Sequence, residues 1–451
     1  MKGFIGFFKE LTHYRSAVFG LLLIALLLVI SAYTVITLPY DQAIQLWRSG
    51  EEVWGDNPRN AVPEWTNLFN GNSLAPTIVL DSTSPTVKKQ SQEVSADMRT
   101  ADFILPFEYN SNSFPDELNV FFAAKYQQKK PQATVKWKTP DGREIQLGDM
   151  TVGENDRFAI SIDQKLARKF NDVNPEIALF AQPGTTDKGQ TPQVLKGNYQ
   201  LVVEGLTFEP NSTLNAKLVV YGQTYGWAGT DHKRRDLMIA LLWGTPIALA
   251  FGFLAAVGST LTTFSIAAIG SWFGGWVDAL IQRLTEINSV LPQLTILVLV
   301  GTLYTRNIWV ILGIVIVLGV FSLSIKSYRS MFLQVKEMPY IEAAHTYGAS
   351  NLRIVFRYMM PKIAPVLIPS FVTLIPSFVF LEASLSVLGL GDPLLPTWGK
   401  ILNDAYTNGA LYKGMYYWVV EPAVLLMLTG LGFSTIGFAL DRIFNPRLQE
   451  L

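Results

Sequence analysis

The sequence predicts a polytopic α-helical membrane protein with an inserted, β-rich domain outside the membrane. Two observations predict this class. Apolar runs without charged residues occur near the N-terminus and repeatedly within residues 237–451, and runs of this kind are long enough for a helix to cross a bilayer. Between them, residues 39–236 are rich in Pro, Asn, Asp, Thr and Gly and contain short apolar stretches, which is typical of strands and turns.

Composition excludes several other classes. The chain has 451 residues, 49% of them hydrophobic and 16% charged, with a formal net charge of zero. This balance does not suit a protein that binds nucleic acid or a disordered tail. Cysteine is absent and the three histidines lie far apart, so we expect no disulfide, no thiolate nucleophile and no metal site. No cofactor is expected.

Residues 18–38 form the first expected span, because they contain no charge and follow Lys2, Lys9 and Arg15. A cleaved signal peptide is the alternative, but its apolar region would be roughly 7 to 15 residues and would end at a small-residue cleavage site. We therefore expect residues 1–38 to hold a cytoplasmic N-terminus and an uncleaved transmembrane helix.

Short apolar stretches separated by turn residues predict a β-sandwich-like domain over residues 39–236. Its turns include Thr139-Pro140-Asp141-Gly142, where Pro sets the first turn angle and Gly tolerates positive φ. One short helix is expected over 163–170, and residues 41–70 resemble a stalk or helix. The expected strands are residues 77–80, 103–109, 118–126, 134–138, 157–162, 176–180, 199–206 and 214–221.

Four aromatic residues of this domain could stack on a ligand, namely Tyr221, Tyr225, Trp227 and Trp137. Such residues more often fill a core or lie at the lipid interface. The domain shows no paired carboxylates at a recognisable spacing and no Gly-rich phosphate loop. Catalysis is therefore not expected.

Residues 237–277, between Asp236 and Asp278, contain no charged residue, and this run is too long for one helix and barely long enough for two. The run could be an interfacial helix plus one span, or a two-span hairpin that turns near Gly258-Ser259-Thr260. The hairpin would place the basic residues downstream outside the cell, against the positive-inside rule, so one span is favoured.

The remaining expected spans are residues 287–304, 307–325, 363–381 and 422–440, which makes six spans in all. A turn at 273–276 and a charged amphipathic segment at 278–286 come before them. The loop charges agree with this topology, since more basic residues fall inside than outside. Those expected inside are Lys2, Lys9, Arg15, Arg283, Lys326, Arg329, Lys336, Arg353, Arg357, Lys362, Arg442 and Arg447.

Residues 331–362 are polar and basic, although they lie between two apolar runs. Pro339 suits the first turn of a helix, and Glu342 then lies where the helix dipole favours a negative charge. Gly348 suits a C-terminal cap, and Ser350 or Asn351 can cap a second helix that runs toward Pro361. The stretch therefore predicts a short helix, a turn and another short helix at the membrane face.

The first of these helices is slim, because Ala343 and Ala344 lie beside the larger Tyr340, Ile341 and Tyr347. A slim helix with a few bulky side chains can insert into a groove on another protein. The alternative is an amphipathic hairpin that lies on the cytoplasmic lipid surface.

Within the spans, no nucleophile, base and orienting group occur together, so intramembrane catalysis is not expected. Glu382 lies at the outer end of the fifth span, and an ionisable group at that depth usually faces the protein interior or a water-filled path. Glu382, Ser384, Ser386 and Pro376 are candidates for a translocation path or gate. Alternatively, Glu382 is a helix-end carboxylate held by backbone N–H groups of the following loop.

Several motifs occur in an order that resembles one family. They are Gly229-Thr230-Asp231 with Arg235-Asp236, Phe273-Gly274-Gly275-Trp276-Val277-Asp278, Glu342-Ala343-Ala344 with Gly348 and Pro361, Glu382-Ala383-Ser384-Leu385-Ser386 with Leu388-Gly389-Leu390-Gly391, and Pro396-Thr397-Trp398-Gly399. Together they are similar to the second permease subunit of dipeptide and oligopeptide ABC importers, the inner-membrane component of binding-protein-dependent transport. The Glu342 motif resembles the EAA loop of that family. The resemblance covers roughly residues 1–38 and 229–450.

Three features depart from the family pattern. Met359 and Met360 replace the usual Ile or Leu residues before Pro361, and Lys233 with Arg234 stands where a polar residue or Leu and then Gly are usual. The large insert after the first span is also not typical.

The resemblance implies a type I ABC importer permease fold and no enzymatic activity in the chain itself. It implies a heterodimer with a homologous permease, two cytoplasmic ABC ATPases, and an extracytoplasmic substrate-binding protein or lipoprotein that delivers peptide. ATP hydrolysis would belong to the ATPases, since the sequence has no P-loop. One ATPase would dock on a set of coupling residues, which are Tyr340, Glu342, Ala343, Ala344, Tyr347, Gly348 and Pro361.

The chain is accordingly expected to be a multi-pass protein of the cell membrane, in contact with lipid, with both termini in the cytoplasm and residues 39–236 outside. Residues 237–451 would form the rest of the permease core, with the coupling loop at 331–362. Two alternatives stay open: a permease for nickel or another small solute, and a membrane-anchored receptor or sensor.

Overall fold

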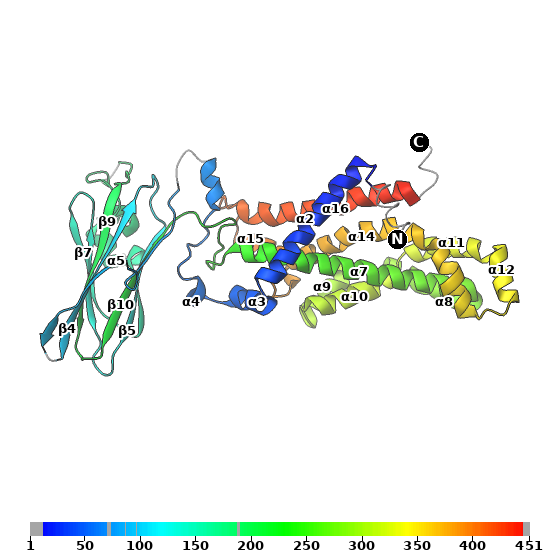
Figure 1. The fold of residues 1–451 in the computed structure, drawn as a ribbon, viewed down its shortest axis with the longest axis horizontal. Helices are drawn as coiled ribbons and strands as arrows, with labels where there is room; N and C mark the ends of the chain where they lie inside the picture. Colours follow the sequence, from blue (N-terminus) through cyan, green and yellow to red (C-terminus); the bar gives the residue numbers. More distant parts are fainter. Residues whose placement is uncertain (1–11, 70–73, 86, 96, 187–189, 445–451) are drawn as a thin grey trace. The chain divides into compact units, whose positions relative to one another are not determined.

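The computed structural model describes residues 12–69, 74–85, 87–95, 97–186 and 190–444. The chain divides into a helical unit, Met1–Arg48 with Ile239–Leu451, and a β unit, Ser49–Met238; Figure 1 colours both along the sequence. The helical unit extends beyond residue 38 because α3 (Tyr40–Arg48) packs Ala43 and Ile44 onto the helical core. The predicted basic residues Lys2, Lys9 and Arg447 lie outside the described residues.

The described residues of the β unit form two antiparallel sheets. One has the strand order β1-β10-β5-β8, and the other has the order β2-β4-β9-β6-β7, with β3 also paired to β4. The strands are β1 (Ile78–Asp81), β2 (Lys88–Gln90), β3 (Glu93–Ser95), β4 (Met98–Tyr109), β5 (Glu117–Lys125), β6 (Gln132–Lys138), β7 (Glu144–Thr151), β8 (Asn155–Ala159), β9 (Gly197–Thr207) and β10 (Thr213–Tyr221). Its helical segments are α4 (Glu51–Trp54), η1 (Glu64–Leu68), η2 (Ile160–Ile162), α5 (Gln164–Lys169) and α6 (Pro175–Ala178).

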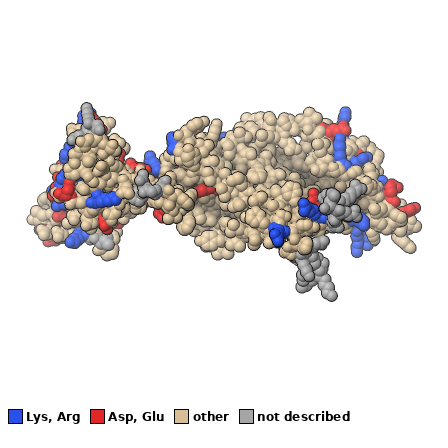
Figure 2. Space-filling model, turned by 90° about the horizontal axis from the view of Figure 1, so that it is seen from above, with Lys and Arg blue, Asp and Glu red and all other residues tan. Residues whose placement is uncertain are grey.

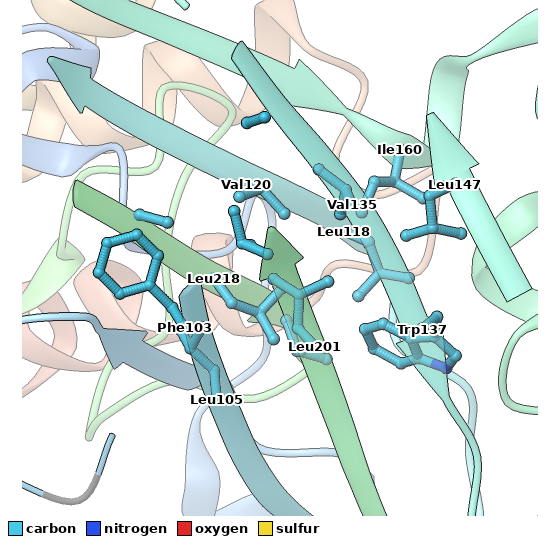
Figure 3. Close-up of a cluster of buried hydrophobic side chains, with 14 of the residues drawn as sticks. Phe103, Leu105, Leu118, Val120, Val135, Trp137, Leu147, Ile160, Leu201 and Leu218 are labelled. Atoms are coloured by element: carbon cyan, nitrogen blue, oxygen red, sulfur yellow. The ribbon is translucent and has the colours of Figure 1, made fainter. Parts of the chain in front are cut away.

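The two sheets share one hydrophobic core. Register pairs Leu105 with Leu201 in one sheet and Val120 with Leu218 in the other, and all four side chains are fully buried. Figure 3 shows these side chains meeting between the strands, with Trp137 at one side of the cluster. Strands with alternating buried and exposed residues give each sheet one apolar face, so burying these faces against each other holds the unit together.

Most of the expected strands are confirmed with shifted ends, but one is wrong. Residues 176–180 begin in the helix α6, because Pro175 occupies its first position after Asn174, where the missing N–H of proline costs nothing. The strand expected at 157–162 ends at Ala159, and η2 follows. The expected turn at residues 139–142 joins β6 to β7, with Gly142 at φ +86°. The sequence reasoning missed β2, β3 and β7, which are rich in polar residues.

The helical unit is built from long apolar helices and shorter connecting ones. Its elements are α2 (Arg15–Thr37), α3 (Tyr40–Arg48), α7 (Leu237–Phe273), α8 (Gly275–Val290), α9 (Gln293–Leu303), α10 (Ile308–Val320), α11 (Ser324–Lys336), α12 (Pro339–Thr346), α13 (Asn351–Arg353), the π-helical segment η3 (Ile354–Met359), α14 (Met360–Leu385), the π-helical segment η4 (Ser386–Leu390), α15 (Trp398–Thr407) and α16 (Tyr417–Phe444).

The apolar run that begins at Leu237 is one continuous helix. α7 has 37 residues and keeps Pro246 inside it, so the two-span hairpin through Gly258 is excluded. The four glycines of α7 all have close neighbours; for example, a Cβ on Gly252 would lie 2.8 Å from the Ile375 carbonyl oxygen of α14. Small residues let membrane helices approach closely, which strengthens their packing.

Among the described residues, four helices are long and apolar enough to cross a membrane, and two bent helix pairs could each form a further span. The pair α8 and α9 bends by 75°, and the pair α10 and α11 bends by 50°. The spans expected at 287–304 and 307–325 are therefore each interrupted, the first at Leu291-Pro292 and the second between Val320 and Ser324. Several apolar helices in one chain make this a helical, multi-pass membrane protein.

Candidate functional site

The centre of the candidate site is the short helix α12, which has well-defined ends. Pro339 occupies its first turn as expected. At the other end Gly348 takes φ +80°, and the N–H groups of Gly348 and Ala349 donate to the carbonyls of His345 and Ala344, both at 3.0 Å. This pattern is a Schellman cap, which needs a residue that tolerates positive φ. The predicted helix and its terminating glycine are confirmed.

One side chain of α12 fixes which face points outward. Ile341 is only 2% exposed and lies in a cluster with Phe264 of α7, Phe332 of α11 and Ile354 of η3. The sequence reasoning grouped Ile341 with the outward bulky residues, and this is wrong, because the residue anchors the helix to the helical unit.

The opposite face of α12 is open. Tyr347 is 92% exposed, and Tyr340, Glu342 and Ala343 are also exposed, while Ala344 is half-buried. Pro361, further along the chain, is exposed as well. The helix therefore presents two tyrosine rings and one carboxylate around a small alanine surface, which is the shape of a helix that enters a groove.

The second helix of the expected pair is not separate. α13 begins at Asn351 after Ser350, whose side chain makes no capping hydrogen bond, and it continues through η3 into α14. Residues 351–390 form one helical candidate span of 40 residues. Continuity arises because Ile354, Val355 and Met359 are buried against the neighbouring helices. Only one tight turn therefore separates α12 from this long membrane helix, so a displacement of α12 would be passed on to it directly.

α11, which leads into α12, is tied to the neighbouring helices by two basic residues. Arg329 donates from Nε to Asp278 Oδ1 at 2.7 Å and from Nη2 to Oδ2 at 2.5 Å, which is a two-point ion pair with fixed geometry. Lys336 Nζ donates to the carbonyls of Ser271 and Trp272 at 3.1 and 2.9 Å. These carbonyls belong to the last turn of α7, where a positive charge is favoured.

The turn between α7 and α8 positions the carboxylate of this ion pair, which belongs to Asp278 of α8. Gly274 and Gly275 take φ +61° and +53°, so the chain reverses within two residues and Asp278 enters the first turn of α8. Figure 2 shows Lys and Arg gathered toward the end of the helical unit that carries α8, α11 and α12, while most of the rest of this unit's visible face is uncharged.

A second group of motif residues meets around Glu382. Glu382 is 5% exposed, and its Oε1 accepts a hydrogen bond from Ser386 Oγ at 2.9 Å. One partner is therefore a hydroxyl one turn along the helix, and the Thr397 side chain also hydrogen-bonds Glu382; the sequence had suggested backbone N–H groups of the following loop. A Cβ at Gly391 would lie 2.5 Å from Ser386 Oγ, and one at Gly399 would lie 2.5 Å from Ser386 Cβ. The chain at Gly391 and Gly399 passes so close to Ser386 that a side chain at either position would collide with it, which is why both positions need glycine.

The other predicted path residues differ in their exposure. Pro376 is buried within α14 and Ser386 is buried, whereas Ser384 is exposed and bonds the Phe380 carbonyl at 2.7 Å. Trp398 is 1% exposed and donates from Nε1 to the Leu241 carbonyl at 2.9 Å. The residues of the Glu382 and Trp398 motifs are thus part of the packed interior of the helical unit.

The motif before α7 folds around one buried ion pair. Asp231 accepts from Arg235 Nε at 2.6 Å and from the N–H groups of Lys233 and Arg235 at 2.8 and 2.9 Å. Asp231 is fully buried and Arg235 nearly so. Arg234, which stands where glycine is usual in the family, adopts φ +66°. The turn therefore forms in spite of the substitution.

The four aromatic residues considered as a ligand platform do not form one. Trp137 and Tyr221 are buried in different sheets, and Trp227 is 78% exposed. The Tyr221 ring instead lies beneath the Arg234 guanidinium, whose Cζ is 4.2 Å from the centroid of the ring.

Comparison with known proteins agrees with these motifs. The family described as "Binding-protein-dependent transport system inner membrane component" matches residues 261–450. Among individual proteins, the glutathione transport system permease protein GsiD of Pectobacterium atrosepticum is 27% identical over 227 residues, which are 50% of this chain and 73% of GsiD. The oligopeptide transport system permease protein OppC of Bacillus subtilis is 27% identical over 225 residues, which are 50% of this chain and 72% of OppC.

A third relative gives the highest identity of the three. It is a Brucella suis protein named as a peptide permease, 30% identical over 226 residues that make up 49% of this chain and 74% of that protein. The matched family region contains α12, the α10 and α11 pair and the Glu382 cluster. The chain belongs to the family of inner-membrane components of binding-protein-dependent transport systems.

Proposed function

We propose that this chain is one permease subunit of an ABC importer that carries peptides across the cell membrane. The observation that supports it most is the geometry of α12, which exposes Tyr347 and Glu342 while Ile341 holds the helix to the core. The matched relatives are named for glutathione, oligopeptide and peptide transport, which favours a peptide over nickel or another small solute.

In this proposal α12 is the coupling helix. It inserts into a cleft of a cytoplasmic ABC ATPase, and Tyr340, Glu342, Ala343, Ala344, Tyr347, Gly348 and Pro361 form or shape the docking surface. A second ATPase docks on a homologous permease that completes the path as a heterodimer. When the ATPases close on ATP they move α12. This movement reaches α14 along the chain through η3, and it reaches α8 through the Arg329–Asp278 pair. The path then changes between outward and inward openings.

The proposed topology counts each bent helix pair as one span, which gives six spans. Both termini and α12 lie in the cytoplasm, because most basic loop residues then fall inside. The β unit lies outside the cell as an inserted β-sandwich. There it is well placed to brace the substrate-binding protein that delivers the peptide. Glu382, Ser384, Ser386 and Pro376 support or line the path near its outer end.

Uptake measurements in proteoliposomes test this proposal. The chain is reconstituted with its partner permease, the two ATPases and the binding protein, and uptake of a labelled dipeptide is compared with uptake of labelled nickel. We expect ATP-dependent accumulation of the dipeptide only. Accumulation of nickel without dipeptide would favour the small-solute permease, and accumulation of neither would refute the transport function.

A further inference from the structure

The two breaks in the bent helix pairs lie beside one cavity of about 260 Å³, which we call the break cavity. Ser259 and Thr260 of α7, Gln293 at the start of α9, and Ser322 and Ser324 at the break between α10 and α11 line it, with Phe378 of α14 on its apolar side. All of these residues belong to the helical unit. Discontinuous membrane helices place polar groups at membrane depth, where transport proteins bind substrates.

The break between α10 and α11 is held in place by side chains of other helices. Thr263 Oγ1 donates to the carbonyls of Gly319 and Val320 at 3.2 and 3.0 Å, and Asn288 Nδ2 donates to those of Leu318 and Phe321 at 3.0 and 3.1 Å. Backbone groups at membrane depth are tolerated outside a helix only when they are satisfied in this way or line a polar cavity. The cavity is therefore a supported part of the fold.

Two hydroxyls on its wall have no hydrogen-bond partner among the described residues. Ser259 and Thr260 are each 6% exposed, and Ser259 Oγ and Thr260 Oγ1 are fully enclosed and unpaired. Neighbouring hydroxyls on α7 behave differently, since Thr262 and Ser265 donate to the carbonyls of Gly258 and Leu261 at 2.6 and 2.8 Å. A buried polar group without a partner is unfavourable. Both oxygens are enclosed in the rotamers seen here, so a ligand pairs with them when the two side chains rotate toward the cavity, and a ligand that pairs with both then gains affinity.

The lining determines the chemistry of that ligand. Within the part of the chain that the structure describes, no Asp, Glu, Lys, Arg or His lines the cavity, so a bound carboxylate or ammonium group would be left without an opposite charge. Hydroxyl and amide groups both donate and accept hydrogen bonds, which matches a neutral group with one N–H and one C=O. Gln293 and Ser324 line the cavity and are exposed residues, and polar side chains at membrane depth usually face a water-filled path.

We propose that the break cavity binds a main-chain amide of the transported peptide, through Ser259 and Thr260. The inference rests on the proposed function and adds a substrate-contacting site to it. Because main-chain amides are common to all peptides, such a site holds the substrate without selecting its side chains. Water is the other neutral ligand with both donors and acceptors, and the experiment separates the two.

The experiment compares Ser259→Ala/Thr260→Val with the wild type in the complete reconstituted importer. Uptake is measured for a dipeptide and for the same dipeptide with a methyl group on its peptide nitrogen, and the variant-to-wild-type ratio is formed for each. The ratio removes any discrimination by the binding protein. The matched control is Thr262→Val/Ser265→Ala, which removes two hydroxyls from the same helix that bond only to their own helix.

We expect the cavity variant to lower uptake of the unmodified dipeptide about tenfold, as the loss of two hydrogen bonds predicts, and to affect the methylated dipeptide much less. Thermal stability should be unchanged or higher, because the hydroxyls removed have no partner. An equal loss for both dipeptides identifies water as the ligand and overturns the inference, as does an unchanged uptake. Absence of dipeptide uptake by the wild type overturns the proposed function itself.

Discussion

Arg234 and Glu117 form an ion pair that joins the turn before α7 to strand β5 of the β unit, with 2.5 Å between Nη2 and Oε2. The Arg234 side chain is 1% exposed, and its Nη1 also donates to the Asn57 carbonyl at 2.7 Å. Its backbone meanwhile adopts φ +66°, a conformation that is strained for a side chain such as that of arginine and that glycine adopts without strain. The strain is thus offset by the buried contacts of the side chain.

Replacing this arginine with glycine separates the two effects. Arg234→Gly should relieve the backbone strain but lower the free energy of unfolding of the β unit by about 2 kcal/mol, because breaking a buried ion pair costs more than the strain returns. Hydrogen exchange of β5 in the full-length protein measures the change. The exposed neighbour gives the control, and Lys233→Gly should leave exchange nearly unaltered. Slower exchange in Arg234→Gly would show that the strain dominates.

The same ion pair predicts a response to acid. Burial acts to raise the pKa of Glu117, but the hydrogen bond from Asn119 and the charge of Arg234 outweigh it, so its pKa lies below the ordinary value. A carboxylate with a lowered folded-state pKa stabilises the protein above its unfolded pKa of about 4.3, and this contribution disappears as the pH falls through the folded-state pKa.

Exchange protection of the β unit should therefore be steady from neutral pH down to about pH 5 and should then decline in stronger acid. Glu117→Gln removes this titrating group, so the variant should be less stable at pH 7 and should lose less of its remaining stability on acidification. Hydrogen exchange corrected for the intrinsic rate at each pH measures both. Identical pH profiles for the two proteins would mean that the pair contributes nothing to the acid response.

Ile341 is expected to transmit force between α12 and the helical core. Ile341→Ala leaves the exposed surface of α12 intact but removes a buried side chain, which costs about 2 to 5 kcal/mol of local packing. ATP hydrolysis by the assembled importer should continue while peptide uptake per ATP falls several-fold. Leu352→Ala, at a residue that is 55% exposed, is the control. An unchanged ratio of uptake to hydrolysis in Ile341→Ala would contradict the anchoring role.

The Arg329–Asp278 pair offers a test by charge exchange. Its side chains are 34% and 16% exposed, so the pair is partly screened, and Asp278→Asn should lower the free energy of unfolding by about 1 to 2 kcal/mol. Asp278→Arg should reduce peptide uptake by the reconstituted importer more than Asp278→Asn does, because two cations would then face each other. The double variant Asp278→Arg/Arg329→Asp should recover part of the loss. No recovery would show that the two positions act independently.

Local rules predicted much of the site. Pro339 and Gly348 bound α12 as expected, because proline in the first turn and glycine at the C-terminal cap depend on only a few neighbouring residues. The orientation of α12 was not predictable in the same way, since apolar residues lie on both of its faces. Only the position of α7 and α11 determines that Ile341 faces inward.

Hydropathy identified the apolar segments but not their breaks. The run through Leu291-Pro292 is apolar on both sides, and the bend between α8 and α9 depends on that proline and on packing against other helices. The sequence suggested Ser259 and Thr260 only as part of a possible turn and not as a binding site, because serine and threonine are common in membrane helices. Their role emerged only where α7, α10 and α14 meet around the cavity. The Arg329–Asp278 pair was missed because the two residues lie far apart in the sequence and meet only in the folded helical unit.

Co-purification with the ATPases tests the coupling-helix assignment most directly. The tagged wild-type chain, Tyr347→Asp and Gly348→Asp are isolated from cells that contain the partner permease and the ATPases. Tyr412→Asp serves as the control, because Tyr412 is 98% exposed and Tyr347 is 92% exposed, but Tyr412 lies outside α12. We predict that wild type and Tyr412→Asp retain the ATPases and that both α12 variants lose them while still binding the partner permease. Full retention of the ATPases by both α12 variants would contradict the docking of an ATPase on α12.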